Sequence, residues 1–370
     1  MIACSLGGSA EDIKGGDPAK LPIASAHLGN AVACEGSRGD VWTTTWADDH
    51  QLYSVSDDTT GFDNACSSNL AVHSIVGETP PNLRGKTVNP MKQFGAWAEV
   101  NPGDGASWKA SGLVSVDGVL YLSISRHHYP DERKPFAHFI QETWDASIIR
   151  STDHGRNWSA TPEIGKAMFP GRLFSNPFFV QHGKDGRGRT NNGGEYIYAT
   201  SSDGVWNNGS GMILGRVRRD QIARLEARDW EFCHGFDEQQ QPIWRPRHDT
   251  ALYTFHASGR ASMTGIHYLE PLDIYIMPQW SYNYSKMAPA DPGSRWKFTR
   301  FDFYQARAPW GPWSLFHHQD YDAEGFYNPG IPAKFISEDG RKLWIFTAGN
   351  PPDAKYYRLN MIPVELRLDV

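Results

Sequence analysis

The chain has 370 residues and a formal net charge of −6 with histidines counted as neutral. Its basic residues form no block, so nucleic acid is not an expected partner, and no apolar run reaches the roughly 18 residues of a membrane-spanning helix. Aromatic residues make up 13% of the chain, which also holds 36 glycines and 24 prolines. Many aromatic residues among many turn formers indicate many short β-strands.

The N-terminal stretch, residues 1–20, reads as a flexible tail, and residues 21–370 read as one folded domain. Cys4 precedes a segment rich in Gly, Ser and Asp, as the lipid-attachment cysteine of a bacterial lipoprotein does, although a plain disordered tail is favoured. The stretch is too short for an intact signal peptide. We expect a secreted, periplasmic or surface-anchored protein whose signal is not in this sequence. The other cysteines match no metal spacing, and a Cys34–Cys66 disulfide stays open.

Five similar hairpins follow one another along the folded part. Each has a strand, a turn with Asp, Gly or Pro, and a second strand; they cover residues 40–58, 108–128, 176–203, 262–281 and 328–350. Their starts are roughly 65 to 85 residues apart, which leaves room for two more strands in each interval. Four-stranded antiparallel blades around an axis form a β-propeller, so the sequence predicts an all-β, five-bladed propeller.

Outer strands are expected within these intervals. They are residues 146–151 and 158–161 in the second blade, 211–219 and 229–233 in the third, and 296–306 and 313–316 in the fourth. Residues 219–228 read as a short helix, and residues 77–107 as a long excursion between the first two blades. The segment 23–33 is expected to supply the outer strand of the last blade and close the ring, because open sheet edges invite aggregation.

The stretch Ser-Thr-Asp-His-Gly-Arg-Asn-Trp, residues 151–158, looks like an Asp-box, a hairpin of sialidases and other glycan-active propellers. Strands alternate in direction, so counting them assigns every loop to one face of the ring. The stretch falls on the face of the hairpin turns, where Asp153 is expected to bond the turn backbone. In glycan-active propellers the substrate lies on the other face, where the innermost strands begin. Functional side chains are expected on the loops there.

Three aspartates are the candidate catalytic residues. Glycoside hydrolysis needs two carboxyl groups, one as proton donor and one as nucleophile or base. Asp40 opens the first hairpin, and Asp57 and Asp58 end its second strand, so all three return to one end. Successive strand side chains point to opposite faces, so only one of Asp57 and Asp58 is expected to face inward. Asp58 is favoured, and Asp57 is equally well explained as a turn former.

The same face gathers polar and aromatic side chains that could bind a carbohydrate. The expected substrate-binding residues are Trp42, Trp108, Lys109, Arg126, His127, His128, Arg172, Asn176, Asp203, Trp206, Trp280, Tyr327 and Asn328. No metal or other cofactor is expected. Residues 57–64 could offer oxygens to Ca²⁺, but their spacing fits no EF-hand loop and a calcium site is not predicted. We expect a monomer.

Four segments carry a family resemblance: residues 37–61, 108–125, 306–314 and 326–349. They resemble the five-bladed propeller glycoside hydrolases, and are most similar to the family linked to endo-D-arabinan hydrolysis. The resemblance covers most of residues 28–350 and implies a sugar-cleaving site on the first-blade aspartates. The arabinanase and fructosidase types have further acids on the second or third blade. Here those positions are Trp108-Lys109 and Ser175-Asn176, so Asp131, Glu132 or Asp203 would have to supply a third carboxylate.

Two other functions remain open. Arg126-His127-His128-Tyr129 resembles the Arg/His/Tyr sets of propeller polysaccharide lyases. In that chemistry a cation neutralises a uronate carboxylate while His or Tyr removes a proton. A non-catalytic glycan-binding propeller would keep the aromatic residues and lose the acids. A sialidase is less favoured, because that fold needs an arginine triad and six blades.

Overall fold

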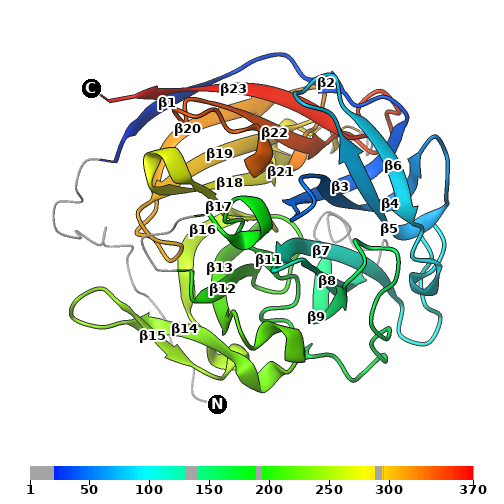
Figure 1. The fold of residues 1–370 in the computed structure, drawn as a ribbon, viewed down its shortest axis with the longest axis horizontal. Helices are drawn as coiled ribbons and strands as arrows, with labels where there is room; N and C mark the ends of the chain where they lie inside the picture. Colours follow the sequence, from blue (N-terminus) through cyan, green and yellow to red (C-terminus); the bar gives the residue numbers. More distant parts are fainter. Residues whose placement is uncertain (1–20, 130–140, 189–193, 288–293, 295, 370) are drawn as a thin grey trace.

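The computed structural model describes residues 21–129, 141–188, 194–287, 294 and 296–369. Their strands form five antiparallel sheets around a common axis (Figure 1). The chain is therefore an all-β, five-bladed β-propeller, as the repeated hairpins predicted. The predicted N-terminal tail lies outside the described residues.

The blades have these strands, each blade given in chain order. The first has β3 (Ser37–Trp46), β4 (Leu52–Phe62), β5 (Ser68–Val76) and β6 (Arg84–Asn89). The second has β7 (Ala106–Val116), β8 (Val119–His128), β9 (Glu142–Ser151) and β10 (Phe169–Pro170). The third has β11 (Phe178–Phe179), β12 (Tyr196–Ser202), β13 (Gly209–Arg218), β14 (Trp230–Phe236), β15 (Pro242–Arg245) and β16 (Tyr253–Ala261). The fourth has β17 (His267–Leu269), β18 (Ile274–Tyr282), β19 (Thr299–Ala306) and β20 (Ser314–Tyr321).

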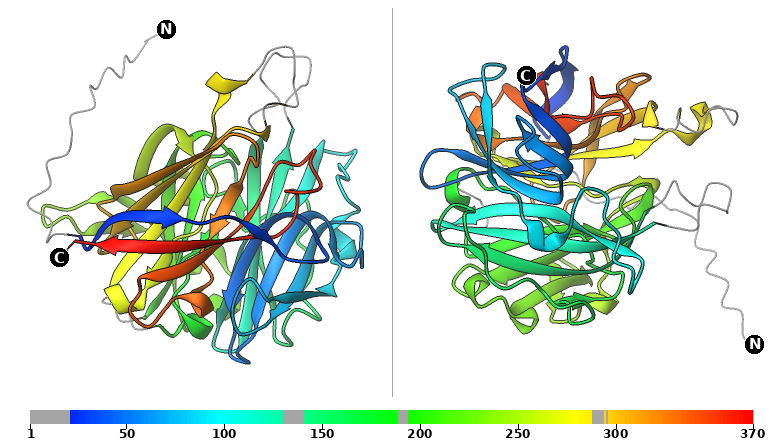
Figure 2. Two further views of the ribbon diagram at one scale, coloured as in Figure 1. Left: turned by 90° about the horizontal axis from the view of Figure 1, so that it is seen from above. Right: turned by 90° about the vertical axis from the view of Figure 1, so that its right-hand side faces the viewer.

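The fifth blade joins the two ends of the described chain. It contains β21 (Tyr327–Gly330), β22 (Lys342–Ala348) and β23 (Asn360–Leu368), and β1 (Ile23–Leu28) pairs with the outer edge of β23. The short strand β2 (Val32–Ala33) also pairs with β23. Figure 2 shows β1 running beside β23. Gln305 of the fourth blade holds β1 from the other side: it accepts a hydrogen bond from the Ile23 amide (3.1 Å) and donates one to the Ile23 carbonyl (2.6 Å). The predicted ring closure is confirmed.

Three expectations about the periphery need correction, and one open question is answered. Residues 219–228 form no α-helix but two 3₁₀ turns, Ile222–Arg224 and Ala227–Asp229, because Leu225 between them has a left-handed backbone (φ 56°). The outer strand of the second blade is β10, not residues 158–161. The excursion 77–107 contains β6, the outer strand of the first blade. Cys34 and Cys66 are both free thiols, so the disulfide left open does not form.

Candidate active site

A distorted hairpin between β3 and β4 brings two of the predicted acids opposite each other. Asp40 pairs with Asp57, and the strand register shifts on both sides of Asp40. Val41 and Trp42, which follow, have left-handed backbones with φ of 68° and 49°. Irregularities of this kind re-aim side chains in a sheet, and here they lie beside the opening acid of the first blade.

The two neighbouring aspartates of β4 both contact the second blade. Asp57 accepts a hydrogen bond from the amide of Ala110 (2.9 Å), and Asp58 pairs with the ammonium group of Lys109. Strand alternation would send these side chains to opposite faces. Asp58 departs from this alternation because its backbone is left-handed, with φ of 36°. Both side chains therefore contact β7. The expectation that only one of the pair, Asp58, faces the pocket stays a prediction.

Asp40 has an environment that favours its protonated form. The hydroxyl of Tyr327 donates a hydrogen bond to its Oδ2 (2.9 Å), the hydroxyl of Tyr357 also contacts it, and both contacts lower its pKa. The causes that raise the pKa outweigh them. Burial, followed by the negative charge of Asp58, raises the pKa of Asp40 to about 7. Burial also raises the pKa of Asp57 well above its ordinary value. The hairpin therefore offers an acid that holds a proton near neutral pH beside a carboxylate paired with a cation.

The raised pKa of Asp40 predicts how stability depends on pH. Folded Asp40 keeps its proton up to a pKa of about 7, whereas an unperturbed aspartate loses it near 3.8. The unfolded state therefore binds fewer protons in that window, and this residue's contribution to stability is lost as pH rises through it. Asparagine does not titrate, so Asp40→Asn removes this loss of stability at higher pH. We expect the Tm of the variant, relative to wild type, to be higher at pH 8 than at pH 4. Thermal melts at the two pH values measure this, and a pH-independent difference would contradict it.

The Arg/His cluster of the second blade is largely buried, and its arginine is bound to an acid of the same blade region, whereas Arg126 Nε and Nη1 and His127 Nε2 have no hydrogen-bond partner among the described residues. Arg126 is 1% exposed, and its Nη2 donates to both oxygens of Asp104 (2.5 and 2.6 Å) and to the Ala106 carbonyl (3.0 Å). Its guanidinium lies over the ring of Trp108, 4.4 Å from the centroid. His127 is buried, and burial lowers its pKa to about 3.

The other predicted contacts of the second and third blades also have partners. His128 stacks on Trp144 with centroids 4.4 Å apart, and the exposed Arg172 pairs with Glu142 at 3.0 Å. Asn176 is fully buried and bonds to the hydroxyls of Ser201 and Ser202 (both 2.8 Å). These contacts fix the loops of this face to the strands that carry them. The proposed binding roles of these residues stay predictions.

Two further polar candidates, Asp203 and Asn328, lie in the third and fifth blades. Asp203 accepts a hydrogen bond from the Tyr253 hydroxyl at 2.7 Å, within the third blade. Asn328 donates to the Val41 carbonyl at 3.2 Å, and so links the fifth blade to the distorted segment after Asp40. Asp131 and Glu132, the other acids considered for a third carboxylate, lie outside the described residues.

The aromatic candidates form a buried cluster between blades. Trp206 packs on Trp280 and Tyr327 with centroids 4.8 and 5.4 Å apart. Trp42 is fully buried, and its indole donates to the Gly39 carbonyl (2.9 Å), while Trp280 donates to the Met263 carbonyl (2.9 Å). The Trp206, Trp280 and Tyr327 rings of this cluster reach Asp40 through the hydroxyl of Tyr327. Whether any contacts a sugar stays a prediction.

Sequence reasoning missed two contributors to the acid cluster. Tyr357 is buried, contacts Asp40, and donates to the backbone carbonyl of Asp58 (3.2 Å). The amide of Ala98, in the excursion after β6, donates to Asp58 Oδ1 (3.1 Å). Strand counting could have found Tyr357, because the loop from β22 to β23 falls on the same face as Asp40. Ala98 carries no side-chain signal, so it could not have been found.

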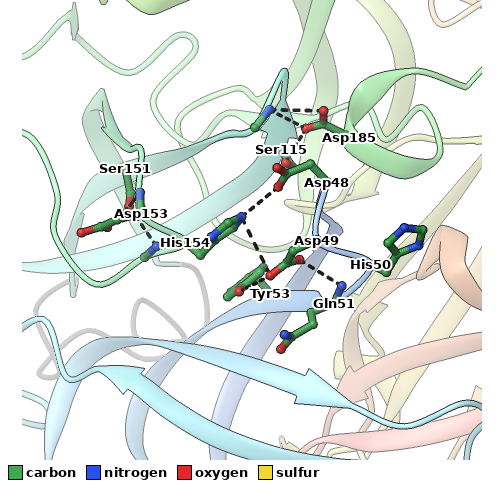
Figure 3. A network of polar contacts seen from close by, with 12 residues as sticks. Asp48, Asp49, His50, Gln51, Tyr53, Ser115, Ser151, Asp153, His154 and Asp185 are labelled. Carbon is green, nitrogen blue, oxygen red and sulfur yellow. Dashed lines mark hydrogen bonds and ion pairs between the residues drawn. The ribbon is translucent and has the colours of Figure 1, made fainter.

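Figure 3 shows the stretch 151–158 beside the turn between β3 and β4. Asp40 lies toward the other end of that hairpin, so the stretch is on the opposite face, as the strand count predicted. Asp153 accepts hydrogen bonds from the Ser151 hydroxyl and the Asn157 amide, both at 2.8 Å. His154 contacts Asp48, in the turn between β3 and β4, at 2.8 Å. A hollow of about 790 Å³ opens on this face and includes Lys184 and Glu270 among its lining residues. We place the candidate site at Asp40 instead, because three acids and a buried cation converge there.

Asp153→Ala provides a test of the stretch on the opposite face. The change removes hydrogen bonds that close the turn, so we expect Tm to fall by about 2–4 °C. Because the turn is remote from Asp40, we expect no change in activity. Calorimetry and the hydrolysis assay proposed below measure the two effects. A loss of activity without a loss of stability would move the site to this face.

Comparisons with known proteins give a fold but no family. No family model matches the chain, and no curated protein matches it. A hydrolase candidate from Bacteroides ovatus is 14% identical, with a TM-score of 0.50, and the match covers 90% of this chain and 87% of that one. The RS223 β-xylosidase is 13% identical, with a TM-score of 0.45 and coverage of 91% and 94%.

A β-xylosidase/α-arabinofuranosidase from a compost metagenome, solved with xylotriose, is also similar. It is 12% identical, with a TM-score of 0.45, and the match covers 93% of this chain and 98% of that one. Among the residues that the structure describes, no helix is long and apolar enough to cross a membrane. At these identities, the likeness to the Bacteroides ovatus structure establishes a shared fold and leaves the activity to be argued from the site.

Proposed function

We propose that the chain is a glycoside hydrolase in which Asp40 and Asp58 are the two working carboxyl groups. The observation that carries this proposal is their contrast in environment. Asp40 is held by tyrosine hydroxyls and has a pKa of about 7, whereas Asp58 is paired with Lys109. Adjacent carboxyl groups that differ in this way are what glycoside hydrolysis uses.

The environments assign a role to each acid. Asp40, still protonated near neutral pH, donates its proton to the leaving glycosidic oxygen. Asp58, held as a carboxylate by its cation, attacks the sugar or activates water on the other side of the bond. Asp57 is 3% exposed and bonded to Ala110, so it supports the hairpin rather than meeting substrate. Tyr327 fixes the orientation of Asp40 through its hydrogen bond.

The distribution of cations favours a neutral glycan over a uronate-containing one. A lyase needs a cation that can turn to the substrate carboxylate. Among the described residues of the second-blade cluster, Arg126 is buried on Asp104 and Lys109 on Asp58. Both cations are thus committed to acids of the protein itself. The family resemblance of residues 37–61, 108–125, 306–314 and 326–349 makes D-arabinan the first substrate to test, and an extracellular or periplasmic setting suits a polymeric substrate.

The proposal is tested with a panel of polysaccharides. The protein is incubated with D-arabinan, other neutral glycans and uronate-containing glycans, and new reducing ends and ultraviolet absorbance are followed together. We expect new reducing ends from a neutral glycan and no absorbance change. Absorbance from an unsaturated uronate would instead favour the lyase, whose base would be His127. Binding of a glycan without turnover would indicate a non-catalytic module.

A further inference from the structure

One residue of the second blade reaches both neighbouring aspartates of the first. Lys109, on β7, is 3% exposed and its Nζ pairs with Asp58. The amide of the next residue, Ala110, donates to Asp57 at 2.9 Å. A single dipeptide therefore binds both acids, Asp58 by an ammonium group and Asp57 by a backbone donor.

Charge balance gives this contact a chemical consequence. Three carboxyl groups, Asp40, Asp57 and Asp58, face one ammonium group at this junction. Burial lowers the pKa of Lys109, but its acidic neighbours, Asp58 first among them, outweigh burial, so the net direction is upward. Lys109 therefore stays charged. An unpaired buried charge is costly, so the one cation favours one carboxylate and leaves protons on the remaining acids.

We propose that Lys109 is a positioning residue that keeps Asp58 ionised and so leaves the transferable proton on Asp40. This inference rests on the proposed function for its catalytic meaning, but the division of charge can be measured without substrate. The other titratable groups that face Lys109 in the described residues are Tyr129 and His127. His127 has its pKa lowered to about 3 by burial, so it stays neutral and adds no competing charge near pH 7.

The first arm counts protons on the free protein. Carbon NMR of protein labelled at the aspartate carboxyl groups is recorded across pH, with the three signals assigned from Asp→Asn variants. In Lys109→Met we expect the three carboxyl groups together to carry about one more proton at pH 7 than in wild type. Lys109→Arg retains the charge and should retain the wild-type count. The double variant Lys109→Met/Asp58→Asn removes both partners and should return the remaining two acids to the wild-type count.

Arg216→Met is the matched control for loss of a cation. Arg216 pairs with Glu231 (2.8 Å) and lies over the ring of Trp244 in the third blade, away from the acids. We expect it to leave the three carboxyl signals unchanged. If Lys109→Met fails to fold, the double variant still tests the inference, because it lacks both the ammonium group and its carboxylate partner and so buries no unpaired ion. A proton count that does not rise in Lys109→Met, or that departs from wild type in the folded double variant, overturns the inference.

The second arm measures the pH–rate profile of hydrolysis. Lys109→Met should move both limbs to higher pH by about one unit or more, because both acids lose a neighbouring positive charge. Lys109→Arg should restore the wild-type profile. A merely structural role would lower the rate without moving the limbs, and that result also overturns the inference. If wild type hydrolyses none of the glycans, the proposed function fails while the NMR arm still judges Lys109.

Discussion

Asp40→Asn is expected to lower kcat for glycoside hydrolysis by about 10²–10⁴-fold, the usual contribution of a general acid. The amide keeps the shape of the side chain and can still accept the hydrogen bond from Tyr327. It has no proton to give to the leaving oxygen. Initial rates on the glycan that wild type cleaves measure the loss. The thermal melts described above establish that the variant is folded.

Asp302→Asn is the control for this change. Asp302, on β19 of the fourth blade, is 3% exposed, and burial raises its pKa as burial does for Asp40. Its nearest cation is Arg260 at 3.7 Å, and it takes no part in the acid cluster described here. We expect the variant to keep wild-type kcat. Full activity in Asp40→Asn, or equal losses in both variants, would contradict the role given to Asp40.

Asp58→Asn is expected to have a still larger effect on rate, about 10⁴-fold in kcat, because it removes the attacking or water-activating carboxylate. It also leaves the ammonium group of Lys109 buried without its anion. Breaking a buried pair on one side costs about 3 kcal/mol or more in the free energy of unfolding. Rate assays and denaturant unfolding measure the two effects on the same preparation.

The double variant Lys109→Met/Asp58→Asn separates those two effects. Removing both partners of a buried pair is far less costly than removing one. We therefore expect it to recover most of the stability lost in Asp58→Asn. It should recover none of the activity, because the carboxylate is still absent. Recovery of activity together with stability would show that Asp58 acts only through the fold.

The blade order could be predicted because its signal is local and repeated. Each hairpin carries its own turn residues, and antiparallel alternation then assigns every loop to a face. That count placed Asp40 on one face and Asp153 on the other. It also required an outer strand for the last blade, which β1 supplies. Two outermost strands were missed: β10, whose two residues carry no periodicity, and β6, which lies within the Pro-, Gly- and Asn-rich excursion 77–107.

The details of the site depend on backbone geometry and on distant partners, which sequence patterns do not report. The left-handed conformation of Asp58 defeats strand alternation and turns both aspartates toward β7. Arg126 looked like a free cation, but Asp104, some twenty positions earlier in the chain, holds it. Trp42 and Trp280 looked like sugar platforms and are buried. The sequence alone does not distinguish a tryptophan that packs in a core from one that binds a sugar, because both are the same residue type at a similar place in a strand.

The most direct test of the central claim is the isotope content of the product. Wild type, Asp40→Asn and Asp302→Asn are incubated, in water enriched in heavy oxygen, with the glycan that wild type cleaves, and the products are analysed by mass spectrometry. A hydrolase with the proposed acid pair places one heavy oxygen atom at each new reducing end in wild type and Asp302→Asn, and yields almost no product in Asp40→Asn. An unsaturated product without the label, or labelled product at full rate from Asp40→Asn, would contradict the account.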